Sequence, residues 1–186
     1  MIEQAHLALS GLEGAEVVRV SGREAMNELS RFTLDLLVTD TATDPADLVD
    51  EAAVLSIADP SGAVARFHLI VVEASHRGQT LGKERYRLDL APPHARLLLR
   101  VTHAIFQDQT TQEIVALVLT RAGFLADLVQ WRLAGQYARR VHTVQYGESD
   151  WAFITRLLAD EGIHYWFEAE GDDAVIVLGD HRSSHE

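Results

Sequence analysis

The sequence predicts an α+β protein that is mainly β, and three observations lead to that prediction. Short runs of alternating apolar and polar residues recur through the first half of the chain. Clusters of glycine, proline and aspartate separate these runs, as turns do. Helical spacing is confined to a few short segments, most of them after residue 93. Short strands at such spacing favour an antiparallel barrel or sandwich.

The first half of the chain is expected to consist almost entirely of strands. Residues 44–49 are an exception, because Pro45 is tolerated in the first turn of a short helix. Residues 59–62, Asp-Pro-Ser-Gly, have turn chemistry and join two strands into a hairpin. Loops are expected at 21–29 and, as a polar turn, at 76–83. The expected strands are 7–9, 17–20, 31–38, 53–58, 65–74 and 85–91.

The character of the sequence changes at Pro93, so we expect two regions, 1–95 and 96–186, within one module. Thr110 and Glu113 have the spacing of a capping box and predict a helix that ends at Gly123. Short strands are expected at 131–133, 140–146, 163–167 and 174–178, and a hairpin turn at 170–173 joins the last two.

Residues 145–168 contain a strand end, a helix and a second strand, and the second region is organised around them. Ser149 is placed to accept hydrogen bonds from the first helical turn. Gly162 provides the left-handed residue that ends the helix. One buried helical face is predicted from apolar residues at three- and four-residue steps, with a phenylalanine beside them: Trp151, Ile154, Leu157, Leu158 and Phe153.

Composition and charge exclude several classes of protein. The chain has no cysteine, which excludes disulfides and thiolate metal sites, and no apolar run of the roughly 20 residues that span a membrane. The N-terminus lacks the features of a signal peptide. The net charge of −12 disfavours nucleic-acid binding. Residues 61–140 nevertheless carry 11 basic and 6 acidic residues, a contrast that either serves docking or is a solvated surface.

No pattern of catalytic or metal-binding residues is present, so we expect no enzyme, metal or cofactor. Glu161 and His164 are three residues apart, but Gly162 separates them from a common helical face. The pairs Asp160 with Glu161 and Asp172 with Asp173 have the residue type of glycosidase acids. Their positions at a helix end and in a turn favour a structural role.

Three aromatic residues, Trp151, Tyr165 and Trp166, are weighed as stacking platforms for a sugar or base, and a role in the core or an interface is favoured. Tyr165 and Trp166 face opposite sides of the predicted strand, so at least one of them reaches a surface. We name Trp166 and Phe106 as candidate subunit contacts.

The stretch 145–167 resembles the pattern Q-Y-x-E-S-D-x-x-F-x-x-R-L-x-x-x-E-G-I-x-Y-x-F of the VgrG family, the spike proteins of type VI secretion systems. More loosely, it resembles the baseplate-hub proteins of contractile phage tails. The matching residues are Gln145, Tyr146, Glu148, Ser149, Asp150, Phe153, Arg156, Leu157, Glu161, Gly162, Ile163, Tyr165 and Phe167.

Other blocks extend the likeness from Gly22 to Asp180. They are Gly22-Arg23-Glu24 with Phe32, the strands at Phe67 and Tyr86, and Ile105-Phe106-Gln107-Asp108. Two departures stand out. His68 is found where the family has glycine, and His103-Ala104 replaces a usual arginine contact.

The resemblance implies a phage tail hub-like module of antiparallel β-barrel material with interposed short helices. It also implies a structural component that forms a homotrimer in the full-length context. Expected partners are the hexameric tube protein, a downstream needle, a tip protein and effectors. Assembly in the cytoplasm followed by export is expected, without stable membrane insertion by this part.

Two alternatives remain open. A phage tail baseplate hub protein would have nearly the same physics. A carbohydrate-binding or glycan-hydrolysing module would need aromatic residues and carboxylates that converge on one concave site.

Overall fold

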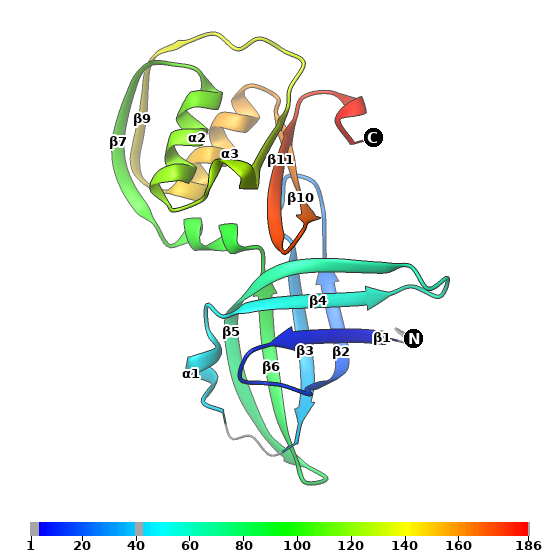
Figure 1. Ribbon diagram of the computed structural model, residues 1–186. Coiled ribbons are helices and arrows are strands. Elements are labelled where there is room, and N and C mark those ends of the chain that lie inside the picture. The colour runs from blue at the N-terminus through cyan, green and yellow to red at the C-terminus, as the bar shows by residue number, and fades with distance from the viewer. Residues whose placement is uncertain (1–3, 40–42, 186) are drawn as a thin grey trace. The chain divides into compact units, whose positions relative to one another are not determined.

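The structure, a computed structural model, describes residues 4–39 and 43–185 (Figure 1). The chain is α+β and mainly β, and it divides into two compact units. Unit 1 is built from the chain up to Glu24, from Leu29–Pro93 and from Ala169–Ala174; unit 2 is built from Ala25–Glu28, His94–Glu168 and the chain from Val175 onward.

Unit 1 is a curled six-stranded sheet with the strand order β1-β4-β5-β6-β3-β2, in which every neighbouring pair is antiparallel (Figure 1). One short helix, α1 (Pro45–Leu48), is capped by the side chain of Asp44, which accepts from the backbone N–H of Ala46. The strands are β1 (Gln4–Leu9), β2 (Glu16–Arg23), β3 (Arg31–Val38), β4 (Ala52–Ala58), β5 (Val64–Thr80) and β6 (Lys83–Ala91).

Strand alternation forms the core of unit 1. On β3 and β6, Leu34 lies opposite Leu88 and Leu36 opposite Tyr86, and all four side chains are buried inside the curl. The polar residues between them face outward. Burying one apolar side chain of this size contributes about 1.5–3 kcal/mol, and a one-residue slip would expose all four, so the alternation determines the register.

Gly22 of β2 lies opposite Phe32 of β3, and this position requires a glycine. A Cβ atom added at Gly22 would lie 2.3 Å from Cδ1 of Phe32, far inside contact distance. The Phe32 ring also packs at 4.7 Å, centroid to centroid, against Phe67. The glycine therefore gives Phe32 space to cover the backbone of the neighbouring strand.

The prediction of a polar turn at residues 76–83 is wrong. Strand β5 continues to Thr80, and the turn consists of Leu81 and Gly82 alone. The ladder between β5 and β6 shifts register between His76 and Gln79, where Gly78 has a φ of +81°. A β-bulge of this kind lets a strand continue through residues that sequence patterns assign to a turn.

Unit 2 contains two α-helices, a two-stranded ribbon and most of a three-stranded sheet with the order β10-β11-β8 (Figure 1). The end of the β10–β11 hairpin, Ala169–Ala174, belongs to unit 1. The ribbon is β7 (Val101–Gln109) paired antiparallel with β9 (Arg140–Ser149). The helices are α2 (Thr111–Arg121) and α3 (Asp150–Asp160). The sheet strands are β8 (Val129–Arg132), β10 (His164–Glu170) and β11 (Asp173–Gly179), and 3-10 turns cover Pro93–Leu98, Ala126–Leu128 and Arg182–His185.

Strand β11 forms the centre of its sheet, and its residues from Ala174 to Gly179 are buried. It pairs in parallel with β8, a departure from the purely antiparallel pattern expected from the sequence. A strand that is buried on both faces reads as a continuous apolar run, as Val175 to Leu178 does.

The helix signals predicted from the sequence are confirmed. Thr110 and Glu113 form the expected capping box of α2, in which each side chain bonds the other residue's backbone N–H. Ser149 accepts from the backbone N–H of Ala152 at 3.1 Å and so caps α3. Gly162 has the left-handed φ of +71° after the helix end. In the described part of the chain, no helix has the length and apolarity to span a membrane.

Candidate functional site

A buried polar network joins the start of α3 to the ribbon. Asp150 is 2% exposed, and its carboxylate accepts from Nε of Arg100 at 2.9 Å and from Oγ1 of Thr102 at 2.9 Å. Gln145, itself 1% exposed, donates from Nε2 to Asp150 at 2.8 Å. The backbone N–H of Asp150 also donates to the carbonyl of Arg100. A buried carboxylate needs this full set of donors, so these residues fix β7 against α3.

Two ion pairs hold the rest of the motif's charged residues. Glu148 pairs with Arg156 at 2.6 Å, and the guanidinium of Arg156 also lies 5.3 Å from the centroid of the Phe153 ring. Hydrogen bonding to Glu148 raises the pKa of Arg156. At the other end of α3, Glu161 accepts from Arg140 at 2.8 Å and from Oγ1 of Thr111 at 3.1 Å. Each charged side chain of the motif therefore has a partner within unit 2.

The apolar residues of the motif form the core of unit 2. Trp151 contacts Tyr165 edge to face at 5.2 Å between ring centroids and stacks more loosely on Phe167 at 6.3 Å. Burial raises the pKa of Tyr165 to about 12. The most buried members, each at most 4% exposed, are Phe153, Leu157, Ile163 and Tyr165.

Tyr146 is the exception among the motif's large side chains, because it is 80% exposed. It lies on the outer face of the ribbon, opposite His103 on β7, and the two rings meet edge to face at 5.1 Å. The next pair along, Ile105 opposite Val144, is also exposed, at 66% and 39%. We call this exposed set the ribbon face: Val101, His103, Ile105, Val144 and Tyr146.

The inner side of the same ribbon packs on the helices (Figure 1). Phe106 is 3% exposed and stacks on Phe153 at 5.5 Å between centroids, with the guanidinium of Arg121 5.8 Å from its centroid. This burial argues against Phe106 as a subunit contact. Because neighbours on a strand face opposite sides, Ile105 takes the outward position. A hollow of about 170 Å³ lies beside the network and is lined in part by Arg100, Arg121 and Asp150.

Trp166, the other candidate contact, is half-buried and is held by a polar cluster. Its indole N–H donates to Glu168 at 2.7 Å, and the guanidinium of Arg132 lies 5.6 Å from its ring. Arg132 bonds both oxygens of Glu168, at 2.9 and 2.6 Å. Burial alone would raise the pKa of Glu168, but the hydrogen bonds from Arg132 and Trp166 outweigh it and lower that pKa. Trp166 is thus rigid and partly open to solvent.

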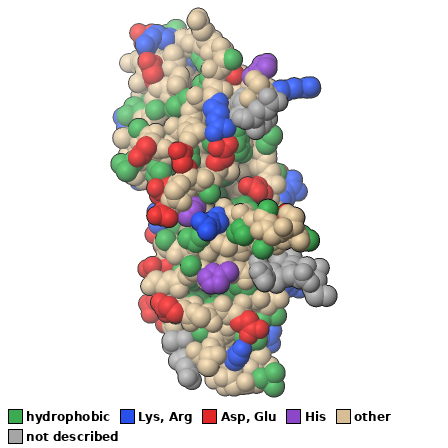
Figure 2. Space-filling view, turned by 45° about the vertical axis from the view of Figure 1, so that its right-hand side comes forward, with side chains coloured by type: hydrophobic (Ala, Val, Ile, Leu, Met, Phe, Trp, Pro, Cys, Tyr) green, Lys and Arg blue, Asp and Glu red, His purple; other side chains and the backbone are tan. Residues whose placement is uncertain are grey.

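The carboxylates considered for catalysis occupy structural positions. Asp160 pairs with Arg140 at 3.3 Å, and Glu161 shares the same arginine. Asp172 and Asp173 are exposed at the β10–β11 turn. Among residues 4–39 and 43–185, no group of three or more histidines and carboxylates is placed to hold a metal ion. On the face shown in Figure 2, acidic side chains are scattered, with arginine and lysine side chains among them.

The sequence pattern alone did not reveal the ribbon face, although a signal was present. Val101, His103 and Ile105 alternate with Thr102 and Ala104, and Val144 and Tyr146 alternate with buried residues. Apolar residues on both sides of one ribbon are typical of a strand with a second packing partner.

Comparisons with known proteins agree on one family. A model of the phage tail baseplate hub (GPD) family matches residues 23–186. The sequence is 35% identical over 184 residues to the type VI secretion system spike protein VgrG4b of Pseudomonas aeruginosa, and 35% identical over 170 residues to VgrG5 of the same organism. These alignments cover 97% and 91% of this chain but 22% and 21% of the relatives. The chain therefore spans about a fifth of their length.

Among solved structures, the E. coli c3393 protein has a TM-score of 0.89 at 26% identity over 97% of this chain and 50% of that chain. It is described as a component of the type VI secretion system with structural similarity to the T4 bacteriophage tail proteins gp27 and gp5.

Proposed function

We propose that this chain, which belongs to the phage tail baseplate hub (GPD) family, is a structural part of the hub of a VgrG-type spike. In this role it supplies a rigid wall of the hub and carries out no catalysis. The relatives VgrG4b and VgrG5 are type VI secretion system spike proteins, which supports the secretion role over a phage particle.

The observation that carries this proposal is how the motif residues are used. The polar residues of the 145–167 motif are bonded within unit 2, and all but one of its large apolar residues pack inside it. The exception is Tyr146, on the ribbon face. A motif that builds a rigid module and leaves one apolar face open fits an assembly subunit better than an enzyme.

The full-length assembly is proposed as a homotrimer, with the ribbon face covered by a neighbouring subunit of the same hub. We further propose that the regions 1–95 and 96–186 act together as one hub module. Its partners would be the hexameric tube protein, the downstream needle, a tip protein and effectors, and assembly would precede export from the cytoplasm.

A chimera tests this function. Residues 1–186 would replace the matching segment of P. aeruginosa VgrG4b, and secretion of the tube protein into the medium would be measured in a strain without other spike genes. We expect the chimera to support secretion and to form the same oligomer as VgrG4b. A soluble chimera that assembles but fails to secrete would contradict the spike role.

Matched variants of the chimera test the ribbon face separately. Ile105→Glu combined with Tyr146→Glu should abolish assembly, because a subunit interface cannot bury two unpaired charges without a large cost. Leu81→Glu, at a hairpin tip where leucine is 99% exposed, is the control and should leave secretion intact. Equal secretion by both variants would exclude the ribbon face as the contact.

A glycan-binding role is tested with the isolated chain. Pull-down on insoluble peptidoglycan should show no saturable binding, because Trp151 and Tyr165 are buried and Asp160 and Glu161 are paired with Arg140. Saturable binding that is lost in Trp166→Ala would favour the carbohydrate-binding alternative instead.

A further inference from the structure

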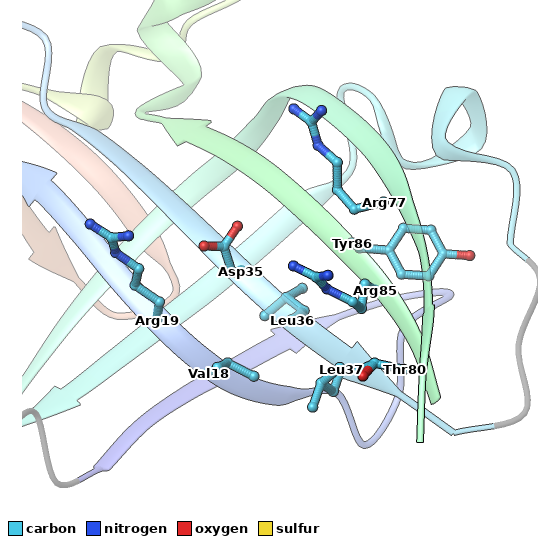
Figure 3. A pocket seen from close by; sticks show the side chains of 9 residues that line it. All are labelled: Val18, Arg19, Asp35, Leu36, Leu37, Arg77, Thr80, Arg85 and Tyr86. Atoms are coloured by element: carbon cyan, nitrogen blue, oxygen red, sulfur yellow. The ribbon is translucent and has the colours of Figure 1, made fainter. Parts of the chain in front are cut away.

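A hollow of about 270 Å³ on unit 1 brings three arginines together. Arg19 of β2, Arg77 of β5 and Arg85 of β6 line it (Figure 3). None of the three makes a side-chain ion pair or hydrogen bond within the described residues. In a chain of net charge −12, three unpaired arginines around one hollow are unexpected on composition alone.

The acidic residue that lines the hollow, Asp35, already has an arginine partner outside the lining. Asp35 accepts from Arg87 at 2.9 Å to Oδ1 and 3.3 Å to Oδ2, so one arginine takes both oxygens. These hydrogen bonds hold the pKa of Asp35 below its ordinary value, and the charges of Arg19 and Arg85 lower it further. The remaining arginines therefore leave the hollow with excess positive charge.

Two β-bulges place the arginines there. The β2–β3 ladder shifts register between Val17 and Arg19, after which Arg19 lies opposite Asp35. The β5–β6 ladder shifts between His76 and Gln79, the interval that contains Arg77. Bulges redirect side chains and are over-represented near functional sites. Two of them on opposite sides of one hollow indicate a site built by the fold.

The lining indicates what kind of anion the hollow takes. Beside the arginines are Val18, which is 59% exposed, and Leu36 and Leu37 of β3. Strand β2 is the last strand of its sheet, so its outer edge has backbone groups available to an extended chain. A bare ion would use the arginines but neither the apolar residues nor the strand edge.

We propose that this hollow binds an extended acidic segment of a partner protein, with carboxylates on Arg19, Arg77 and Arg85 and apolar side chains on Val18 and Leu37. Guanidinium groups bind carboxylates through paired hydrogen bonds, and the apolar lining fits the residues between the acids. Nucleic acid is a poorer fit, because three arginines neutralise few phosphates in an otherwise acidic protein. This site goes beyond the proposed hub role and does not depend on it.

The test uses a fluorescein-labelled peptide of alternating glutamate and valine, with fluorescence anisotropy against residues 1–186 at low ionic strength. Saturable binding is expected. The affinity should fall about tenfold in the Arg19→Gln variant and about tenfold in the separate Arg85→Gln variant. Arg66→Gln removes an equal charge from an exposed arginine of β5 outside the hollow and should leave affinity unchanged. Equal weakening in that control, or no saturable binding to the wild type, would overturn the proposal.

Changes to the ligand test the same site without altering the protein. The matched glutamine-valine peptide should bind at least tenfold more weakly, because it lacks the charges. Inorganic phosphate at the peptide's concentration should not displace it. Full displacement by phosphate would make this a site for bare anions, and tighter arginine-dependent binding of a single-stranded DNA oligonucleotide would make it a nucleic-acid site; either result would overturn the peptide assignment.

Discussion

At the scale of single residues, Asp150 links the sequence motif to stability. Its carboxylate is buried and accepts from three donors: Arg100, which directly precedes β7, Thr102 of β7 and Gln145 of β9. Replacing it by Asn removes the negative charge and leaves Arg100 without its partner. Breaking a buried pair in this way costs about 3–5 kcal/mol. The half-exposed arginine side chain moderates the loss, so we expect about 2–3 kcal/mol.

Urea unfolding followed by circular dichroism measures this cost. The control is Asp172→Asn, at the exposed β10–β11 turn, which should shift the unfolding free energy by less than about 0.5 kcal/mol. Similar losses in the two variants would show that the buried network contributes little.

His94 makes the stability of unit 2 sensitive to acid. The ring is fully buried between Phe124, at 4.4 Å, and Phe167, at 5.2 Å, and neither ring nitrogen has a hydrogen-bond partner within the described residues. Burial lowers the pKa of His94 to about 3, from an ordinary value of 6.5. The folded chain therefore stays unprotonated at this ring between those values, whereas the unfolded chain takes up the proton.

Stability should consequently fall as the pH drops from about 6.5 towards 3, by at most about 1.4 kcal/mol per pH unit from this residue. His94→Leu should reduce the loss between pH 7 and pH 4 by on the order of 2 kcal/mol. His142→Leu, at an exposed position of β9, should leave the pH profile unchanged. Urea midpoints across the pH series provide the measurement, and parallel profiles for wild type and His94→Leu would refute the prediction.

At the scale of elements, the pairing of β2 with β3 beside the Phe32 ring depends on the absence of a side chain at Gly22. In Gly22→Ala the new methyl would overlap the Phe32 ring, so the ring or the strand must move. Such overpacking costs about 1–3 kcal/mol. Ser21→Ala on the same strand, at an exposed position, is the matched control and should change the melting temperature little. An unchanged melting temperature in Gly22→Ala would show that Phe32 has free space to move.

Local chemistry made most elements predictable from the sequence. The alternation at 31–38 predicted β3 to the residue, and the signals at Thr110, Ser149 and Gly162 located both longer helices. The end of β5 was missed, because Gly78 in a bulge resembles a turn until the partner strand is known. The parallel pairing of β8 with β11 was missed for a similar reason: pairing depends on tertiary structure, which a local pattern does not contain.

The candidate site was less predictable than the fold. The motif residues were found as a block, but they include both the buried Gln145 and the exposed Tyr146, adjacent residues that face opposite sides of β9. Phe106 was named as a candidate subunit contact, but it is buried and its neighbour Ile105 is exposed. The sequence shows that the two residues face opposite sides of the strand, but only the packing of the ribbon shows which side faces outward. The arginine hollow is lined by residues of four strands and depends on two bulges, and neither feature is visible in the sequence.

At the scale of the whole molecule, the family, the packed motif and the open ribbon face together describe a module made for assembly. Its two compact units each have a surface suited to a partner. Unit 1 has the positively charged arginine hollow, and unit 2 has the exposed apolar side chains of the ribbon face. Our central proposal is that one copy contacts the next through the ribbon face.

The most direct measurement is the absolute mass of residues 1–186 in solution, by light scattering across a concentration series. We predict a mass that rises with concentration towards three times the 20.6 kDa chain. The variant with Ile105→Glu and Tyr146→Glu should stay at the single-chain mass throughout, with an unchanged melting temperature because both side chains are exposed. A wild type that remains monomeric at every concentration, or a double variant that associates as the wild type does, would contradict the account.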